Sequence, residues 1–312
     1  MVSAEKNLLQ EEMEKEDAFF LAGHQQEISK VEYDRGVWYN LKTSLKENKL
    51  AMICLILLGV IMIASLLAPL SSYDPDAMDL RSKLQLPSKE HFFGTDSLGR
   101  DYFTRALYGG RVSLTVGFFS MLVSIIVGTL FGTISGYIGG VTDNLMMRFV
   151  DILMSVPSFL LIIIINSFLS PSIFTMIIII GIFSWMGVAR IVRAETMSLK
   201  ERDFVLAAKH LGARHWQIIF GHIIPNMSSS IIVAGSLAVA RAILTESALS
   251  FMGIGVQLPK ASWGTMLQGA QTYIMDVPTL AVFPGIFIVL TVFSFNILGD
   301  ALQNALEPKR MK

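Results

Sequence analysis

Apolar runs of membrane-spanning length alternate with polar segments along the chain. A helix needs about 20 apolar residues to cross roughly 30 Å of hydrocarbon. Runs of this kind cover Ala51–Leu70, Val112–Thr142, Ile152–Ala189, Ser228–Phe251 and Val277–Gly299. The third run is too long for one crossing, because as a single helix it would extend about 57 Å. We expect it to fold back near residues 166–171, where polar residues and a proline interrupt it. The pattern predicts an all-α integral membrane protein with six transmembrane helices.

Basic residues are divided unevenly between the two sides of this arrangement. The segments on the side of the termini carry 17 Lys and Arg, against 7 on the opposite side. The positive-inside rule therefore places both termini in the cytoplasm. The expected regions are a cytoplasmic tail that could be disordered (1–36), a juxtamembrane interfacial segment (37–50), the six-span domain (51–306) with its outer loop (71–111) and cytoplasmic loop (190–226), and a C-terminal cytoplasmic tail (307–312).

Composition supports a membrane protein and narrows the chemistry. Hydrophobic residues make up 53% of the chain and charged residues 16%, which is too apolar for a soluble surface. The net charge of zero gives no indication of a nucleic-acid partner. A single cysteine, Cys54, excludes a disulfide within the chain and a cysteine-rich metal site. The polar, Glu- and Lys-rich first 48 residues are unlike a cleavable signal peptide.

Glycines recur in the second predicted span, at Gly128, Gly132, Gly136, Gly139 and Gly140. Small residues four apart let two helix backbones approach closely in lipid. We interpret them as a packing surface within the chain, with the lining of a transport path as the weaker alternative.

The cytoplasmic loop has helical signals on both sides of one glycine. Apolar residues recur at helical spacing before and after Gly212, which suits a helix C-terminus, and Pro225 is expected to end the second helix before the membrane. Two short helices with this much apolar surface suggest a docking site for another protein. The alternatives are a helix pair on lipid headgroups, a DNA-reading helix-turn-helix, and a metal site from His210, His215 and His222. The nearby spans argue against DNA, and histidine spacings of five and seven argue against a metal.

The segments LAAKHLGA and HIIPN in this loop resemble the Ala-Ala-x3-Gly signature of ABC importer permeases. The matching positions are Ala207, Ala208, Gly212 and Pro225, while Leu206 stands where the family has a glutamate. From about residue 37 the segments NKLAMICLILLG, FGTDSLGRDYFTRALYGGRVSLTVG, MMRFVDILMSVPSFLL, LTESALSFMGIGVQLP, ASWGTML and NILGDALQNALEPK are similar, in this order, to the C-type permease of oligopeptide, dipeptide and nickel importers.

The resemblance implies a type I importer permease fold whose cytoplasmic loop holds a coupling helix seated in a groove of an ATPase subunit. The implied interface residues are Phe204, Leu206, Ala207, Ala208, Lys209, Leu211, Gly212, Ala213 and Pro225. The implied partners are a homologous B-type permease, two ABC ATPase subunits, an extracellular or periplasmic substrate-binding protein, and a peptide. ATP and Mg²⁺ would bind to the partner subunits and no cofactor to this chain, which would lie in a bacterial or archaeal cell membrane and would not itself be an enzyme.

The stretch GTDSLGRD, residues 94–101, resembles a nucleotide-binding phosphate loop but lacks its chemistry. Such a loop needs a lysine for the phosphates and a hydroxyl residue for Mg²⁺, and Arg100 and Asp101 stand at these positions. The predicted topology also places the stretch outside the cell. It matches a family element, and we expect Gly94, Asp96, Gly99, Arg100 and Asp101 to rigidify the outer surface, with contact to the substrate-binding protein as the alternative.

Ionisable residues in or beside the spans are further candidates. Arg241 and Glu246 lie in the fifth span, five residues apart and so poorly placed to pair. They are candidates for a gate or path, and a structural hydrogen bond is the equal alternative for Glu246. Arg148 and Asp151, three residues apart, are predicted to pair and to form a cytoplasmic clamp with Asp300.

Two other classes of protein remain as rivals. A stand-alone secondary transporter or channel predicts inverted repeats, and we find no convincing repeat between residues 50–150 and 150–300. An intramembrane enzyme needs a nucleophile and base, or a zinc set, at membrane depth, and the sequence offers neither. Within the resembled family, peptide is favoured over a nickel complex by the breadth of the family.

Overall fold

The structure is a computed structural model that describes residues 48–306. The predicted tails, 1–36 and 307–312, and nearly all of the juxtamembrane segment lie outside these residues. In the described range the helices are α3 (Lys49–Leu66), η1 (Ala68–Leu70), α4 (Tyr102–Ile138), α5 (Gly140–Ser155), α6 (Ser158–Phe168), α7 (Ile173–Leu199), α8 (Asp203–His210), α9 (His215–Ile218), η2 (Ile219–Ile223), α10 (Ile224–Asn226), α11 (Ser228–Phe251), α12 (Trp263–Ala270), η3 (Gln271–Tyr273) and α13 (Thr279–Leu306). Apart from one isolated bridge between Thr95 and Asp101, residues 48–306 form no β-strand.

Five of these helices, α3, α4, α7, α11 and α13, are long and apolar enough to cross a membrane. A sixth crossing requires α5 and α6 to act as one span, and they are bent by 78° at their junction. The predicted count of six therefore holds only with a broken third span. The break lies at Pro157, which precedes the first residue of α6 and has the fixed φ that favours a helix start.

The bounds of the spans agree with the apolar runs in some places and differ in others. Helix α11 covers Ser228–Phe251 as predicted, and the chain turns back between Phe168 and Ile173, close to the expected position. Helix α4 begins ten residues before the charge-free run, at Tyr102, because Asp101 caps it by accepting a hydrogen bond from the Thr104 N–H (2.8 Å). Helix α12 was not predicted at all.

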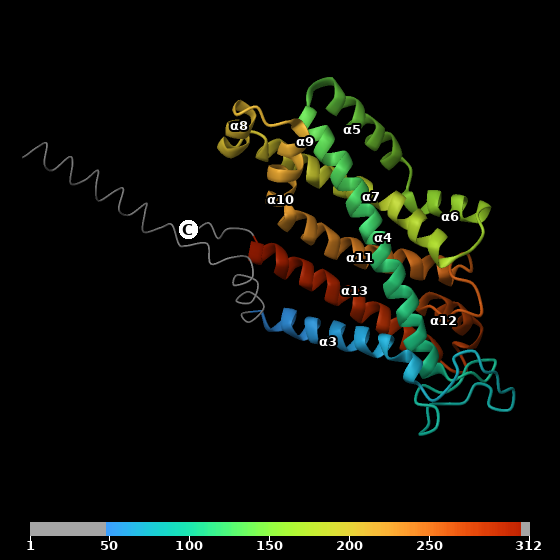
Figure 1. Cartoon of the computed structure of the whole chain (residues 1–312). Coiled ribbons are helices and arrows are strands. Elements are labelled where there is room, and N and C mark those ends of the chain that lie inside the picture. Colours follow the sequence, from blue (N-terminus) through green and yellow to red (C-terminus); the bar gives the residue numbers. More distant parts are fainter. Residues whose placement is uncertain (1–47, 307–312) are drawn as a thin grey trace, which may run out of the picture.

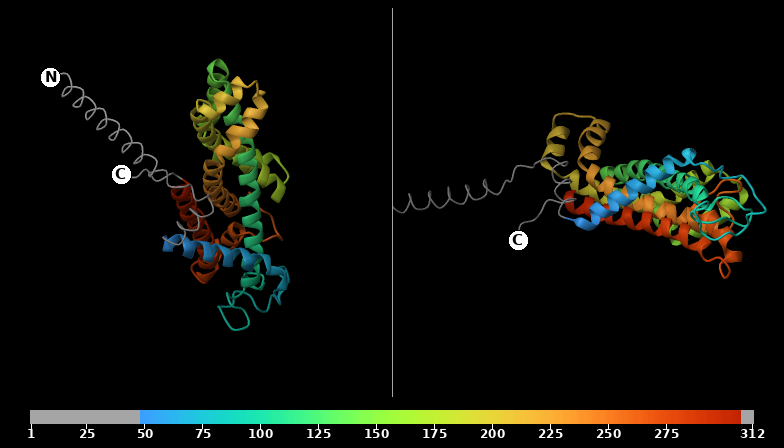
Figure 2. Two further views of the ribbon diagram at one scale, coloured as in Figure 1. Left: turned by 60° about the vertical axis from the view of Figure 1, so that its left-hand side comes forward. Right: turned by 90° about the horizontal axis from the view of Figure 1, so that it is seen from below.

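The long helices form one bundle with distinct ends. Helix α4 packs against α7 and α11, and α13 packs against both α11 and α3 (Figure 1). The short helices α8–α10 lie at one end of the bundle, and the loop before α4 lies at the other, as both further views also show (Figure 2). The two regions that the sequence singled out are therefore at opposite ends of the molecule.

Close contact between α4 and α7 explains the glycines of the second span. A side chain at Gly132 would collide with the carbonyl oxygen of Ala189, and one at Gly136 would lie 2.8 Å from the carbonyl oxygen of Arg193. Gly128 likewise faces Val188 at a distance that leaves no space for a methyl group. These glycines let the two backbones touch, so the geometry agrees with packing within the chain.

Candidate functional site

The loop that the sequence predicts to be cytoplasmic folds into two short helices joined at Gly212. Helix α8 ends as the N–H groups of Leu211 and Ala213 donate to the carbonyls of Ala207 (3.0 Å) and Ala208 (3.1 Å). Gly212 has φ +81°, a left-handed conformation that ends helices and strongly favours glycine. Helix α9 then begins at His215, where the Arg214 N–H donates to the side-chain oxygen of Gln217 (2.8 Å). The expected helix–glycine–helix arrangement is present.

One face of this loop is anchored to the bundle. Val205, Ile218 and Ile223 are buried and form a cluster with Val188 and Val192 of α7. Their burial fixes α8 and α9 on the end of α7.

The opposite face carries most of the residues nominated from the sequence. Leu211 is 88% exposed, and Phe204, Leu206, Ala207, Lys209, Gly212 and Pro225 are also exposed, whereas Ala208 and Ala213 are half-buried. Two large aromatic side chains, Trp216 and Phe220, are exposed as well and stack at 5.9 Å between ring centroids. We name the exposed apolar set Phe204, Leu206, Leu211, Trp216 and Phe220 the loop surface.

Pro225 does not end the second helix as predicted. The chain continues from α9 through the π-helical turn η2 into α10, where Pro225 lies in the first turn, and the break before α11 falls at Met227. In a regular helix, the proline ring would clash with the carbonyl four residues earlier. In the wider π turn the Ile224 N–H donates to the Ile219 carbonyl. This turn lets the helical path continue through Pro225.

A polar cluster that sequence reasoning missed ties three helices together behind the loop. Asp143, in the first turn of α5, accepts two hydrogen bonds from Arg193 of α7, at 2.5 and 2.6 Å. The Ser135 hydroxyl of α4 donates to the same carboxylate (2.5 Å), and Lys200 donates to the Gly136 carbonyl (3.1 Å). The cluster joins the C-terminal ends of α4 and α7 to the start of α5. The available signal was an acidic residue three positions after two adjacent glycines, but its partner lies 50 residues away.

The predicted clamp has different partners. Asp151 pairs with Arg190 of α7 at 2.5 Å, not with Arg148. Both side chains of this pair are nearly half exposed, so its contribution is small. Arg148 and Asp300 are exposed, and no ion pair within residues 48–306 joins either of them to Asp151.

Glu246 and Arg241 lie on opposite sides of α11. The Glu246 side chain is completely buried and accepts hydrogen bonds from the hydroxyls of Ser113 (2.8 Å) and Ser250 (2.7 Å). Its position beside α4 agrees with the structural alternative, since both oxygens have partners within the chain. Arg241 is exposed, and none of the ion pairs in the described range includes it.

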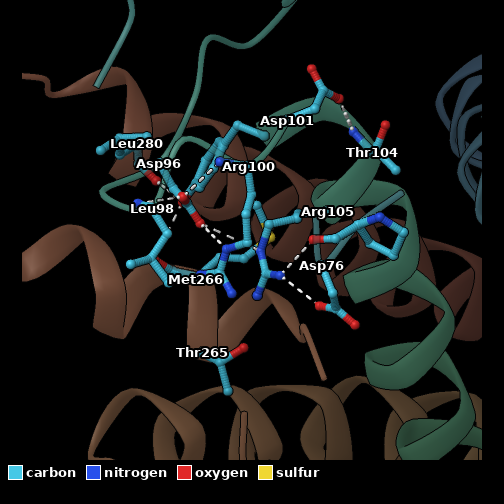
Figure 3. A network of polar contacts seen from close by, with 12 residues as sticks. Asp76, Asp96, Leu98, Arg100, Asp101, Thr104, Arg105, Thr265, Met266 and Leu280 are labelled. Atoms are coloured by element: carbon cyan, nitrogen blue, oxygen red, sulfur yellow. Dashed lines mark hydrogen bonds and ion pairs between the residues drawn. The ribbon is translucent and has the colours of Figure 1, made fainter. Parts of the chain in front are cut away.

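The outer element, residues 94–101, is a compact polar network (Figure 3). Asp96 accepts from the Arg100 side chain (2.7 Å) and from the N–H groups of Leu98 (2.8 Å) and Arg100 (3.1 Å). Arg105 of α4 lies 3.7 Å from the same carboxylate and donates to Asp76 (3.1 Å). Arg100 is thus directed to an acidic group within the chain, and the loop offers no cradle for a phosphate.

Two glycines and a nearby turn complete this outer element. Gly94 and Gly99 have φ +77° and +74°, and a side chain at Gly99 would collide with the backbone of Asp79. The hydroxyl of Ser82 donates to the Asp79 carboxylate (2.7 Å), and this bond, with the Arg81 N–H, holds the pKa of Asp79 below its usual value. The element is folded by its own contacts.

No group of three His, Cys, Asp or Glu residues within residues 48–306 is placed to hold a metal ion. His215 instead contacts Tyr137 of α4, with 3.0 Å between the hydroxyl and the ring nitrogen. It therefore helps to attach the start of α9 to the bundle.

A helical bundle with five helices, or six with the bent pair, that are long and apolar enough to cross a membrane defines a multi-pass membrane protein. Comparison with known proteins agrees. Residues 128–312 match the family described as binding-protein-dependent transport system inner membrane component, and residues 37–87 match the N-terminal TM domain of oligopeptide transport permease C. The chain belongs to the first of these families, and the resemblance to C-type ABC importer permeases is confirmed.

Curated relatives align over nearly the whole chain. The oligopeptide transport system permease protein OppC of Bacillus subtilis (strain 168) is 41% identical over 292 residues, covering 93% of this chain and 95% of that protein. The dipeptide transport system permease protein DppC of Alkalihalophilus pseudofirmus is 43% identical over 275 residues, covering 87% and 90%. The OppC protein of Escherichia coli (strain K12) is 42% identical over 278 residues, covering 88% and 92%.

Proposed function

We propose that this chain is the permease subunit of an ATP-driven ABC importer for oligopeptides or dipeptides. Membership of the family and the names of the aligned relatives support a peptide substrate. The chain supplies part of the transport path in the cell membrane, and hydrolysis of ATP with Mg²⁺ takes place on separate subunits. A nickel complex is the alternative substrate within the resembled family.

The loop surface is the proposed contact with an ATPase subunit, and it is the observation that carries the proposal. A surface helix pair that served only this chain would bury its large apolar side chains, yet Leu211, Trp216 and Phe220 are exposed while Val205 and Ile218 on the reverse face are buried. Attachment to lipid headgroups would favour basic residues beside the apolar ones, and Lys209, His210 and Arg214 do lie near Leu211. A protein groove is supported instead by Gly212 and Ala213, the two small residues that follow Leu211 and suit close insertion.

The cluster around Asp143 explains how movement of the loop would reach the bundle. Helix α7 leads directly into α8, and Arg193 of α7 is bonded to Asp143, which also accepts from Ser135 of α4. Because α4 and α7 also touch along their glycines, the two helices move as one body. Closure of the ATPases would then tilt both helices and alternate access to the path.

The proposed assembly contains one further permease, two ATPase subunits and a substrate-binding protein. Both termini and the loop surface face the cytoplasm, and the outer element faces the binding protein. A six-helix subunit is too small to enclose a path for a peptide alone, so the second, B-type permease supplies the other wall.

Uptake of a labelled peptide into proteoliposomes tests this function. The complete complex with binding protein and ATP should import the peptide, and the chain alone should not. Leu211→Asp should abolish ATP-dependent uptake and the recovery of ATPase subunits on purification. Met275→Asp is the matched control, since Met275 is equally exposed and lies between α12 and α13 at the other end of the bundle, and it should retain the ATPase subunits. ATP-independent uptake by the chain alone would instead support a secondary transporter.

A further inference from the structure

Arg241 lies near the middle of a membrane helix. It is 13 residues after Ser228 and 10 residues before Phe251, the two ends of α11. At 1.5 Å per residue, both ends are about 15 Å or more away along the helix axis. Its side chain is exposed, and no ion pair in the described part of the chain compensates its charge.

The face of α11 that carries Arg241 is opposite the one that α4 covers. On the covered face, Val239 and Ile243 lie where a side chain at Gly117 would meet them, and Glu246 bonds to Ser113. Arg241 follows Val239 by two residues and therefore points about 200° away around the helix. Leu244, on the open face, is also exposed.

The open face of α11 differs from other open faces of the bundle. Helix α13 exposes a stripe of apolar residues, and so does α3, as expected of surfaces in contact with lipid: Val282, Ile286, Val289 and Phe293 on one, and Ile53, Ile56, Val60 and Ile63 on the other. The guanidinium of Arg241 would be costly to place in lipid at this depth. Ionisable residues within membrane spans face protein or a water-filled cavity. The charge indicates that this face of α11 borders a water-filled cavity or another protein rather than lipid.

The chemistry of a peptide supplies a counter-charge. A guanidinium forms paired hydrogen bonds with a carboxylate, and every unmodified peptide carries one such group at its C-terminus whatever its side chains. Glu246, the other ionisable residue of α11, is not available for this purpose, because serine hydroxyls hold its oxygens in a buried position. We propose that Arg241 faces the translocation path and binds the C-terminal carboxylate of a peptide in transit, an inference that rests on the proposed function.

The test compares one tripeptide as the free acid and as the C-terminal amide. Import rates are measured in proteoliposomes that contain the complete complex, with saturating loaded binding protein so that capture is not limiting. Arg241→Gln should slow the free acid about tenfold, the usual loss when a hydrogen bond between charged groups is removed. The amide should slow by less than about twofold, because it offers no carboxylate to the guanidinium. Arg241→Lys should give an intermediate ratio of the two rates, since it keeps the charge and loses the fork.

Arg111→Gln is the matched control. Arg111 is also an exposed arginine in a membrane helix, but it lies near the outer end of α4 over the ring of Tyr108, and its removal should leave the ratio unchanged. An unchanged ratio in Arg241→Gln, including equal slowing of both peptides, would overturn the proposal. Failure of both Arg241 variants to assemble with the second permease would overturn it too, since the side chain would then serve a subunit contact. Absence of import by the unaltered complex would contradict the proposed function instead.

Discussion

Two glycine-containing segments at opposite ends of the molecule differ in how far their side chains are buried. In the outer element, Gly94, Asp96, Gly99, Arg100 and Asp101 are all buried. In the loop that carries Gly212, most of the residues nominated from the sequence are exposed, with Ala208 and Ala213 half-buried. The outer element completes its own contacts, whereas the loop leaves large apolar groups uncovered. A segment of the first kind maintains the shape of one chain, and uncovered apolar groups as in the second kind are typical of an interaction site.

The glycines themselves sharpen this difference. Gly99 and Gly212 have similar positive φ angles, but a side chain at Gly99 would strike the Asp79 backbone while one at Gly212 would meet nothing within 4 Å. Position 99 is therefore restricted by both backbone conformation and space, and position 212 by conformation alone. The variants below are ordered by the expected change in the free energy of unfolding of the purified subunit.

Gly99→Ala should have the largest effect. Strain at positive φ and the collision with backbone together should lower the free energy of unfolding by about 3–5 kcal/mol. Gly212→Ala, the matched control, suffers only the strain and should lower it by about 1–2 kcal/mol. Thermal unfolding in detergent measures both. Equal losses would contradict the steric difference between the two glycines.

Asp143→Asn should have an intermediate effect. It removes a two-bond contact with Arg193 and weakens the bond from Ser135, which should cost about 1–3 kcal/mol. Asp151→Asn is the control, because the Asp151–Arg190 pair is half exposed and should contribute at most about 1 kcal/mol. In the complete complex, Asp143→Asn should also reduce the peptide imported per ATP hydrolysed. An unaltered ratio of import to hydrolysis would show that the cluster does not transmit movement.

Leu211→Asp should have the smallest effect on the subunit itself. An exposed side chain with no buried contacts should change the free energy of unfolding by less than about 0.5 kcal/mol. Val205→Asp, six residues earlier on the buried face of the same loop, should destabilise the loop, as limited proteolysis would detect. If Leu211→Asp unfolds the subunit, its loss of ATPase binding would no longer indicate a contact surface.

The sequence predicts the membrane helices well where charge marks their limits. Helix α11 and the turn after α6 agree with the apolar pattern, because polar residues and proline interrupt the runs there. Helix α4 starts earlier than predicted since Arg105 and Arg111 lie inside it, with Arg105 buried against the outer loop. A charge-free criterion cannot recognise a buried, paired arginine as helical. Pro157 separates α5 from α6 inside the third apolar run, where no charged residue marks the limit of a helix.

The site was predicted in its local features and missed in its long-range ones. The helix end at Gly212 follows from local backbone chemistry, and the structure contains it. The Arg193–Asp143 contact joins residues 50 positions apart, and the pairing of Asp151 with Arg190 spans 39, so neither follows from helical spacing. Pro225 was misjudged because a π turn before it allows the helical path to continue.

Photo-crosslinking at Leu211 tests the central claim most directly. A photoreactive amino acid at this position in the complete complex should crosslink in high yield to the ATPase subunit, and the same residue at Met275 should not. Such a result would place the loop surface in the ATPase interface. Crosslinking of position 211 to lipid alone, or to no ATPase in an actively transporting complex, would contradict the account.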